Sequence, residues 1–448
     1  MPTVTTVPLI LLIVLLWHYT KGQTLSIVLF TSVLNAASAL DLGGLGVPPW
    51  LFALGLCLCF QVLRGHTAFH FTSGANQLSI NLLLLFIGYA VLTGIFFPFV
   101  FAGTPVINMK GPTAAPLAWS QTNLAQLCYL LAAVMVYFLT VSRPRSVLQQ
   151  AVRWYVYGCT FSALFAFYQL ANAVLHVPYP TAILYSNPSH VIYHAYQING
   201  MWRLNSTFSE ASVMASYMTS AIALDGYMMA TQSFSGWRLA RLTLMISALL
   251  LTISSVGYAC MIFMVGAAVL LYALKLVRSG RVSPLSVLIV TTILCVGVTT
   301  YTLDGAASET ISKVLRSTLL DKSNTQSYRD RTMTSEASLT TLTDTYLMGA
   351  GWGSVRASGL VYTLLGNVGV IGTGVFAMLL ASLFLPLLRR RRRNAEVEAM
   401  PIFEPVLFAT TVTVLGACIA GAEPVEPMLW TLLGMATLGY TPTPPGTV

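Results

Sequence analysis

The sequence predicts an all-α polytopic membrane protein. Of its 448 residues, 56% are hydrophobic and only 8% are charged, and the mean hydropathy is +0.74. A soluble domain carries about 25% charged residues, so lipid must solvate most of this chain. Apolar windows of about 20 residues recur along the whole length, which is the pattern of spanning helices and not the alternation of a barrel. We therefore expect a single transmembrane domain over residues 1–448, with about 12–13 transmembrane helices.

The expected spans follow the apolar runs in order. The first run, Val7 to Trp17, lacks a basic n-region and a small-residue cleavage site, so we interpret it as a retained span and not as a signal peptide. Residues 240–276 fit either two short helices or one bent helix, and the last span is short. The spans are expected near residues 4–19, 24–41, 48–63, 78–100, 121–141, 148–176, 208–230, 240–255, 256–276, 284–302, 357–388, 403–421 and 427–441.

Positive charge sets the orientation of these spans. The arginine run from Arg389 to Arg393 must be cytoplasmic, because membrane proteins keep Lys and Arg on that side. Alternation from this run puts most other cations inside as well, consistently from Lys21 onward. The cations that remain outside are concentrated in two long loops, residues 177–207 and 303–356, which suggests a site for an anion. The outside cations are Lys110, Arg203, Lys313, Arg316, Lys322, Arg329, Arg331 and Arg356.

The two outer loops differ in character. Residues 177–207 are rich in Tyr, Pro, Asn and His, which suits sugar contacts or an irregular cap. Residues 303–356 are expected to be largely helical and lie between the tenth and eleventh spans. There, Ile311, Leu315 and Leu319 recur at helical spacing and predict an amphipathic helix on the membrane surface. A second helix is expected from Arg331 to Tyr346.

The first candidate site is the run from Arg203 to Ser212, at the outside end of the seventh span. We expect Arg203 and Glu210, seven residues apart, to share one face at the start of a helix. Arginine offers a planar fork of donors that matches phosphate. Glu210 would be partly removed from water near the membrane boundary and would suit general base work. The alternative is that Glu210 only stabilises the positive end of a helix dipole.

The second candidate site combines two segments of the large outer loop, Ser327 to Thr332 and Gly349 to Arg356. Arg329 and Arg331 would point apart on a helix, but both would reach one ligand from a turn. Glycines would let backbone N–H groups approach an anion closely, and the next helix adds its positive end. The alternative is a solvated loop with Arg–Asp pairs, followed by an ordinary Gly-rich turn.

Other polar residues give weaker signals. His190 and His194 have the spacing of a zinc pair on a helix, but no third ligand stands out, so no metal site is predicted. Asp225 is interpreted as a cap or an ion partner, and the Gly-rich run from Gly366 to Gly374 as helix packing. Glu423 and Glu426 are interpreted first as turn residues and second as a carboxylate site. The scattered cations do not suggest nucleic acid.

Four of these segments together resemble the O-antigen ligase/polymerase superfamily, over roughly residues 200–380. The run from Arg203 to Ser212 is similar to R-x-x-G-x-F-x-E-P-S, with Ser206 in place of Gly and Ala211 in place of Pro. The helix segment from Ser327 to Arg331 is followed by G-x-G-x-G-S-x-R at Gly349 to Arg356. An N-x-G-x-x-G run follows at Asn367 to Gly372.

The resemblance implies a GT-C-like, inverting glycosyltransferase of the bacterial inner membrane, with its active site facing the periplasm. Its substrates would be undecaprenyl-pyrophosphate-linked oligosaccharides, and it would need no metal or cofactor. Glu210 and Arg203 would be catalytic, and the pyrophosphate and glycan would be bound by Arg329, Arg331, Arg356 and Tyr328. The partners would be membrane lipid and the lipid-linked glycan. The sequence does not decide whether a polysaccharide chain-length regulator is also a partner.

Within the superfamily, the sequence favours a Wzy-type polymerase of O-antigen or exopolysaccharide over a ligase. Ligases resemble one another in having a His-Asn pair just before the eleventh span, whereas residues 303–356 contain no His and Arg356 stands in the matching place. A ligase joining the glycan to another acceptor remains the nearest alternative. A lipid-linked glycan transporter is a further one, although it predicts paired broken helices and ionisable residues at the midplane.

Overall fold

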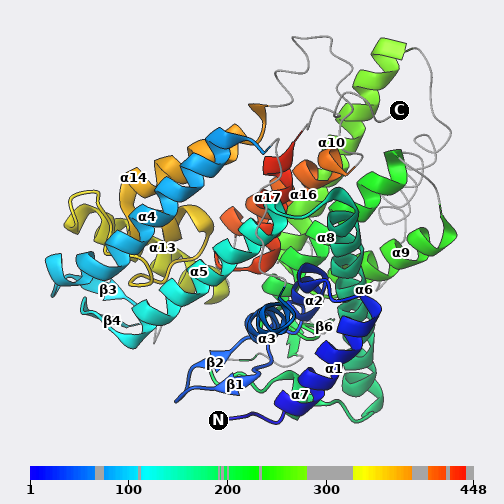
Figure 1. The fold of residues 1–448 in the computed structure, drawn as a ribbon, viewed down its shortest axis with the longest axis horizontal. Helices are drawn as coiled ribbons and strands as arrows, with labels where there is room; N and C mark the ends of the chain where they lie inside the picture. Colours follow the sequence, from blue (N-terminus) through cyan, green and yellow to red (C-terminus); the bar gives the residue numbers. More distant parts are fainter. Residues whose placement is uncertain are drawn as a thin grey trace.

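The computed structural model describes residues 1–65, 75–108, 113–189, 192, 196–198, 201–231, 235–279, 326–385, 402–419 and 424–439. In these ranges the chain is mostly helical, with three short β-hairpins (Figure 1), which agrees with an all-α membrane protein. Among the described residues, four helices are long and apolar enough to cross a membrane. They are α4 (Gln77–Val100), α5 (Gln121–Val141), α6 (Arg145–Leu175) and α14 (Leu360–Ser382).

The remaining helices match most of the other expected spans, but they are shorter or more polar. The expected span at residues 24–41 is helical only over α2 (Thr24–Thr31). Residues 240–276 form two helices and not one bent helix. The expected span 284–302, the surface helix expected around Leu315 and the arginine run expected to be cytoplasmic lie outside the described residues. The other helices are α1 (Thr6–Tyr19), α3 (Pro49–Leu63), α7 (Thr181–Leu184), α8 (Ala211–Thr231), α9 (Gly236–Leu250), α10 (Ser255–Ser279), α13 (Gln326–Asp344), α16 (Phe403–Ile419) and α17 (Pro427–Leu438).

Three antiparallel hairpins interrupt connections that we expected to face outside. The hairpins are β1 (Leu40–Asp41) with β2 (Gly46–Val47), β3 (Pro105–Ile107) with β4 (Ala114–Pro116), and β5 (Tyr196–Ile198) with β6 (Met201–Arg203). None was expected from the sequence, because strands of two or three residues are too short to give an alternating pattern. Two of them meet the candidate segments, since β6 ends at Arg203 and the Ile107 carbonyl of β3 accepts from the Arg356 N–H.

The helices run between two opposite ends of the molecule. One of them, which we call the Glu210 end, gathers the start of the chain and several connections that we expected outside. Hydrogen bonds join distant segments there: Met1 to Asp41, Thr5 to Ile183, Asn187 to Ala36, Ala36 to Thr207, and Asn35 to both Ser209 and Glu426.

The opposite end, which we call the Arg64 end, gathers the connections that we expected inside. The Arg64 guanidinium lies over the Trp17 ring at 5.5 Å, so α1 and α3 end side by side. Asn76 donates hydrogen bonds to the carbonyls of Ser382 and Thr437, which joins the start of α4 to the ends of α14 and α17. In the described ranges, the long helices therefore run in alternating directions between the two ends, whereas α13 (Gln326–Asp344) runs from the Glu210 end only as far as the middle of α14.

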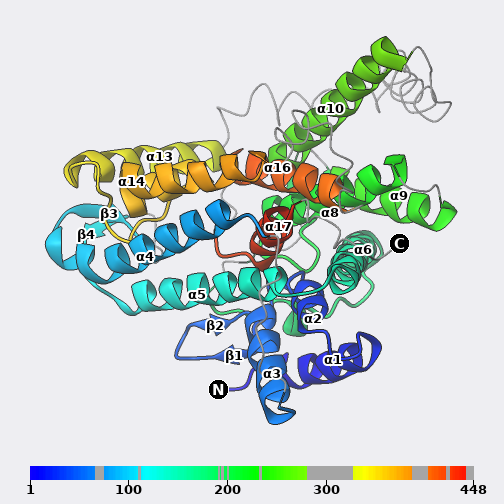
Figure 2. The same cartoon turned by 45° about the horizontal axis from the view of Figure 1, so that its top comes forward.

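At the centre of the bundle is α8, the helix that follows Glu210. Its residues from Ala211 to Asp225 are buried with the exception of Val213, and it packs against α6, α9, α10 and α16. It contains too many Ser, Thr and Tyr residues, together with Asp225, to count as an apolar span, but its small residues let its neighbours approach closely. Figure 2 shows α4, α5, α13 and α14 lying side by side in the other half of the molecule.

Candidate functional site

The run from Arg203 to Glu210 is a buried turn and not the start of a helix. Arg203 ends strand β6, and α8 begins only at Ala211. Between them, the backbone N–H groups of Asn205 and Ser206 donate to the Gln169 side-chain oxygen at 3.1 and 2.8 Å. A side chain of α6 thus satisfies donors that a helix would have used. The expectation that Arg203 and Glu210 share one helical face is therefore wrong.

Ser206 occupies the tightest position of this turn. Its φ of +53° lies in the left-handed region that glycine favours. The Ser206 hydroxyl donates to the Ser162 carbonyl at 2.6 Å, and the Ser206 carbonyl accepts from Tyr185 at 2.7 Å and from Tyr179 at 3.2 Å. Burial raises the pKa of both tyrosines above the usual range, so they remain neutral donors. The turn is held from several sides.

Arg203 anchors the turn to the residues that follow α9. Its Nε donates to the Thr252 carbonyl at 3.1 Å, and the neighbouring Leu204 N–H donates to the Leu251 carbonyl at 3.0 Å. Both carbonyls follow the last turn of α9, where the helix dipole is negative and a guanidinium is stabilising. Arg203 is half-buried, so part of its role is to anchor the turn that precedes Glu210.

Glu210 is half-buried and immediately precedes α8. Its Oε2 accepts a hydrogen bond from the Ser212 hydroxyl at 3.0 Å, and its carbonyl accepts from the Met214 N–H at 3.1 Å. Within the described part of the chain, its carboxylate makes no ion pair. The carboxylate therefore stands at the positive end of α8 with capacity left to accept a proton or a further hydrogen bond.

Glu426 is a second carboxylate of this end, and its setting could not be read from the sequence. It immediately precedes α17, but its side chain makes no capping hydrogen bond to that helix. Its Oε1 accepts from the Asn35 amide at 3.2 Å and its Oε2 accepts from the Tyr217 hydroxyl. Asn35 in turn binds Ser209, the residue before Glu210. The turn that we expected is present at residues 424–425, whereas Glu423 lies outside the described residues, so the carboxylate site formed by the pair stays a prediction.

The helix expected from Arg331 to Tyr346 is present as α13. Tyr328 and Arg329 are exposed, whereas Arg331 is half-buried, so the two arginines face differently, as their spacing predicts. One turn further on, the Thr334 hydroxyl lies 2.9 Å from that of Ser358, just before α14. This contact brings the start of α13 beside the segment that carries Arg356.

The Gly-rich turn is built to fold and not to hold an anion. The N–H groups of Ala350 and Gly351 donate to carbonyls inside α14 at 2.8 and 2.9 Å. Those of Ser354 and Val355 donate to the Asn367 side-chain oxygen at 3.0 and 3.1 Å, so the expected cradle for a ligand is wrong. A Cβ on Gly351 would lie 2.5 Å from a carbonyl oxygen of α4, which explains that glycine by packing.

The same turn does present Arg356. Its N–H donates to the Ile107 carbonyl of β3 at 2.8 Å, and its side chain is exposed. The Asn367 side chain, inside α14, joins the turn through three hydrogen bonds, with the N–H groups of Ser354 and Val355 and with the Val355 carbonyl. The expectation that the run from Gly366 is a packing element is confirmed, since a Cβ on Gly369 would lie 2.4 Å from a backbone oxygen.

The segment of Arg356 also belongs to the Glu210 end. A Cβ on Gly359 would lie 2.7 Å from the Cys418 carbonyl, in the last turn of α16. Because α16 runs antiparallel to α8, with Gly416 opposite Ser216, that last turn lies beside the start of α8. The candidate residues therefore share one end of the molecule, although they are not joined to Glu210 by an ion pair in the described ranges.

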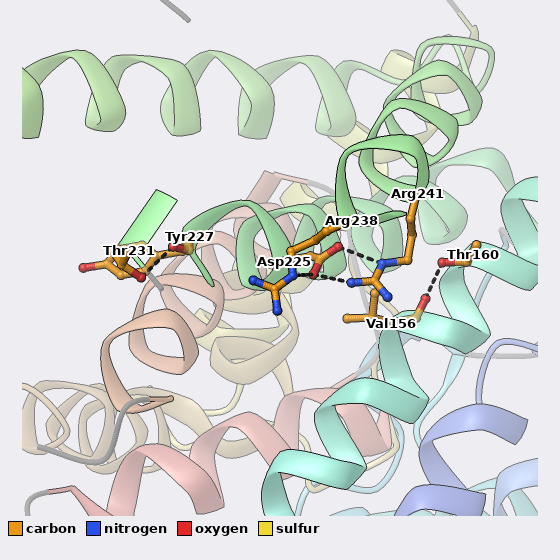
Figure 3. A network of polar contacts seen from close by, with 7 residues as sticks. All are labelled: Val156, Thr160, Asp225, Tyr227, Thr231, Arg238 and Arg241. Carbon is orange, nitrogen blue, oxygen red and sulfur yellow. Dashed lines mark hydrogen bonds and ion pairs between the residues drawn. The ribbon is translucent and has the colours of Figure 1, made fainter. Parts of the chain in front are cut away.

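Asp225, at the other end of α8, is an ion partner, as the sequence suggested (Figure 3). Its buried carboxylate accepts from Arg241 at 2.8 and 2.6 Å and lies 3.5 Å from Arg238. The Arg241 guanidinium also lies over the Tyr157 ring at 5.6 Å. Fifteen helical residues put Asp225 about 22 Å from Glu210, so it belongs to the Arg64 end and not to the candidate site.

In the described ranges, no group of three His, Cys, Asp or Glu side chains is arranged to hold a metal ion, and His190 and His194 lie outside those ranges. The sequence matches no protein-family model, and the search of curated proteins finds no match.

Proposed function

We propose that the protein is a bacterial polysaccharide polymerase. It would transfer a growing glycan from undecaprenyl pyrophosphate onto a lipid-linked repeat unit, at the periplasmic face of the inner membrane. The observation that carries this proposal is the meeting of three distant segments at the Glu210 end. These are residues 203–210, the start of α13 and residues 356–359, and each resembles a motif of the O-antigen ligase/polymerase superfamily.

Both departures from the family pattern fall where the fold supports the family's residue. Ser206 adopts the left-handed backbone of the glycine it replaces. Ala211 is the first residue of α8, the position in which proline is favoured at a helix start. The turn is therefore the shape that the motif describes, which supports the resemblance independently of residue identity.

The proposed reaction forms one glycosidic bond and breaks one glycosyl–phosphate bond. An acceptor hydroxyl attacks the anomeric carbon of the lipid-linked chain, and Glu210 takes the hydroxyl proton. The bonding electrons leave with undecaprenyl pyrophosphate, and the anomeric configuration inverts. Arg331 and Arg356 stabilise the charge that develops on the leaving group, and Arg329, which faces differently on α13, binds the glycan. Pyrophosphate is already a good leaving group, so the proposal requires no metal ion or cofactor.

The other residues have supporting roles in this proposal. Arg203 anchors the turn before Glu210 to the end of α9, and it faces the same outer boundary. Tyr328, exposed on α13, supplies an aromatic surface for a sugar ring. The exposed apolar side chains of α4, such as Leu92, Phe96 and Phe99, would lie against membrane lipid and the polyprenyl tail.

A ligase is the second candidate function. It would use the same donor and the same Glu210 chemistry but a different acceptor. The absence of histidine from residues 303–356 and the presence of Arg356 at the end of the Gly-rich turn favour the polymerase. A transporter is less well supported, because the buried ion group of α8, at Asp225, is fully paired by two arginines.

Substitution of Arg331 and of Arg356 tests the proposal. Purified wild-type protein in detergent or liposomes, given lipid-linked repeat units, should produce a ladder of products on a gel. Arg331→Gln and Arg356→Gln should each lower the rate of polymer formation by roughly 100-fold, the loss typical of one transition-state donor. Arg64→Gln, which changes the same side chain at the opposite end, should leave the ladder unchanged.

Other outcomes of this experiment are equally informative. A wild-type ladder that survives both Arg331→Gln and Arg356→Gln would remove these residues from the site. Transfer of a single intact glycan to a different acceptor, with no ladder, would identify a ligase. No transfer at all by well-folded protein, with repeat units from several bacteria, would contradict the proposed function.

A further inference from the structure

A chain of hydrogen bonds connects Glu426 to the residue before Glu210. Asn35, in the connection after α2, donates from its Nδ2 to Glu426 Oε1 at 3.2 Å. Its Oδ1 accepts from the Ser209 hydroxyl at 3.0 Å and from the Ser209 N–H at 3.4 Å. Asn35 and Glu426 are 391 residues apart in the sequence, so this connection is purely a product of the fold.

The direction of this chain is dictated by its two ends. A backbone N–H can only donate, so Asn35 must turn its oxygen towards Ser209. An ionised carboxylate can only accept, so the Asn35 amide nitrogen must face Glu426. The Tyr217 hydroxyl donates to the other oxygen of Glu426, which fixes that carboxylate from the side of α8. The amide of Asn35 therefore has one orientation that satisfies both neighbours.

This arrangement holds Ser209, the residue immediately before Glu210. Earlier positions of the turn are held by Gln169, which binds the N–H groups of Asn205 and Ser206. The position next to Glu210 is held by Asn35 through Ser209. Hydrogen bonds to a charged group are stronger than those between neutral groups. The Glu426 carboxylate therefore holds the Asn35 amide more strongly than an uncharged partner would.

We propose that Glu426 is a positioning residue for Glu210 and acts through Asn35 and Ser209. The proposal rests on the proposed function, because it treats Glu210 as the group that takes the acceptor proton. Glu426 does not need to touch the substrate in this role. It fixes the amide of Asn35, and the amide fixes Ser209, the residue from which the chain continues to Glu210. A misplacement of about 1 Å at such a group lowers turnover by roughly 100-fold.

The test exchanges the donor and the acceptor between the two positions. Asn35→Asp puts one carboxylate against another and destroys the direction of the chain. Glu426→Gln removes the charge and leaves the Asn35 amide with a partner of ambiguous direction. In the double variant Asn35→Asp/Glu426→Gln, the new carboxamide donates to the new carboxylate and still accepts from Tyr217. The other oxygen at position 35 still accepts from Ser209, so the whole hydrogen-bond sequence is restored.

We expect kcat to fall where the hydrogen bonds of Asn35 are broken and to rise again where they are restored. Asn35→Asp should lower kcat by roughly 100-fold with the KM for the lipid-linked donor nearly unchanged, because binding is retained. The double variant should be at least about 10-fold faster than Asn35→Asp alone, a coupling that only interacting residues show. Tyr217→Phe, which loosens Glu426 without touching Asn35, should give a smaller loss of kcat. This last variant serves if Asn35→Asp does not fold.

The proposal is overturned if Asn35→Asp and Tyr217→Phe keep the wild-type kcat. It is also overturned if the double variant is no faster than Asn35→Asp at equal amounts of folded protein. Wild-type protein provides the reference for the function itself: if it forms no polymer, the proposed function has failed and not the positioning role. Glu404→Gln, a carboxylate that also accepts from a tyrosine but lies at the Arg64 end, is the matched control and should keep the wild-type kcat.

Discussion

Ser206 illustrates how a single residue can depart from a sequence pattern and preserve its geometry. Its left-handed backbone costs about 1 kcal/mol for a residue with a Cβ. Its hydroxyl offsets this cost with hydrogen bonds to the Ser162 carbonyl and hydroxyl at 2.6 and 3.0 Å, each contributing about 1 kcal/mol. The side chain is fully buried, so these bonds cannot be replaced by water.

We therefore predict opposite results for two substitutions of Ser206. Ser206→Gly removes the backbone strain together with the hydrogen bonds, so the melting temperature should change by only a few degrees and activity should remain. Ser206→Val combines a β-branched side chain with a positive φ and should lower the melting temperature strongly. Thermal unfolding in detergent measures both. Equal stability of the two variants would show that the turn does not need this backbone conformation.

At the level of single elements, α8 joins the two ends of the molecule through two differently arranged carboxylates. Glu210, before the helix, accepts one hydrogen bond from a side chain. Asp225 is paired with the guanidinium groups of Arg241 and Arg238. The helix of 21 residues is about 31 Å long, close to the thickness of the hydrocarbon core, about 30 Å. The paired Asp225 joins α8 to α9 and stabilises the packing of the two helices. Glu210, which makes no ion pair in the described ranges, is suited to take part in proton transfer.

The Asp225 group gives a prediction about stability and not about catalysis. Asp225→Asn leaves Arg241, whose side chain is only 10% exposed, without its ionic partner. Removing one member of a buried ion pair costs about 3–5 kcal/mol, so the melting temperature should fall clearly. Asp344→Asn, an exposed carboxylate at the end of α13, is the control and should change it little. An Asp225→Asn protein as stable as the wild type would mean that the arginines find other partners.

The sequence predicted the long helices well and the local geometry of the site poorly. The bounds of α4 and α5 lie within one residue of the expected spans, because continuous apolar runs end abruptly at polar residues. The truncation of α2, the β-hairpins and the turn before Glu210 depend on contacts with distant residues, such as Gln169. The role of the Gly-rich turn was misjudged because periodicity does not say where backbone N–H groups find their partners.

For the molecule as a whole, the two ends carry different chemistry. The Arg64 end holds paired or stacked arginines, which suits a cytoplasmic surface. The Glu210 end holds two carboxylates, a network of neutral donors and the segments of Arg331 and Arg356. A site for transfer from a lipid-linked pyrophosphate requires this combination of a base and cations at one membrane boundary. We propose that Glu210 performs the proton transfer there.

The most direct measurement is the release of undecaprenyl pyrophosphate by purified protein, compared with the number of glycosidic bonds formed. Wild-type protein should release one lipid pyrophosphate for each bond. Glu210→Gln keeps the size of the side chain and its hydrogen bond from Ser212 but cannot take a proton, so both quantities should fall together by roughly 100-fold or more. Glu404→Gln should match the wild type. Release and bond formation that persist at the wild-type rate in Glu210→Gln would exclude Glu210 as the group that takes the proton.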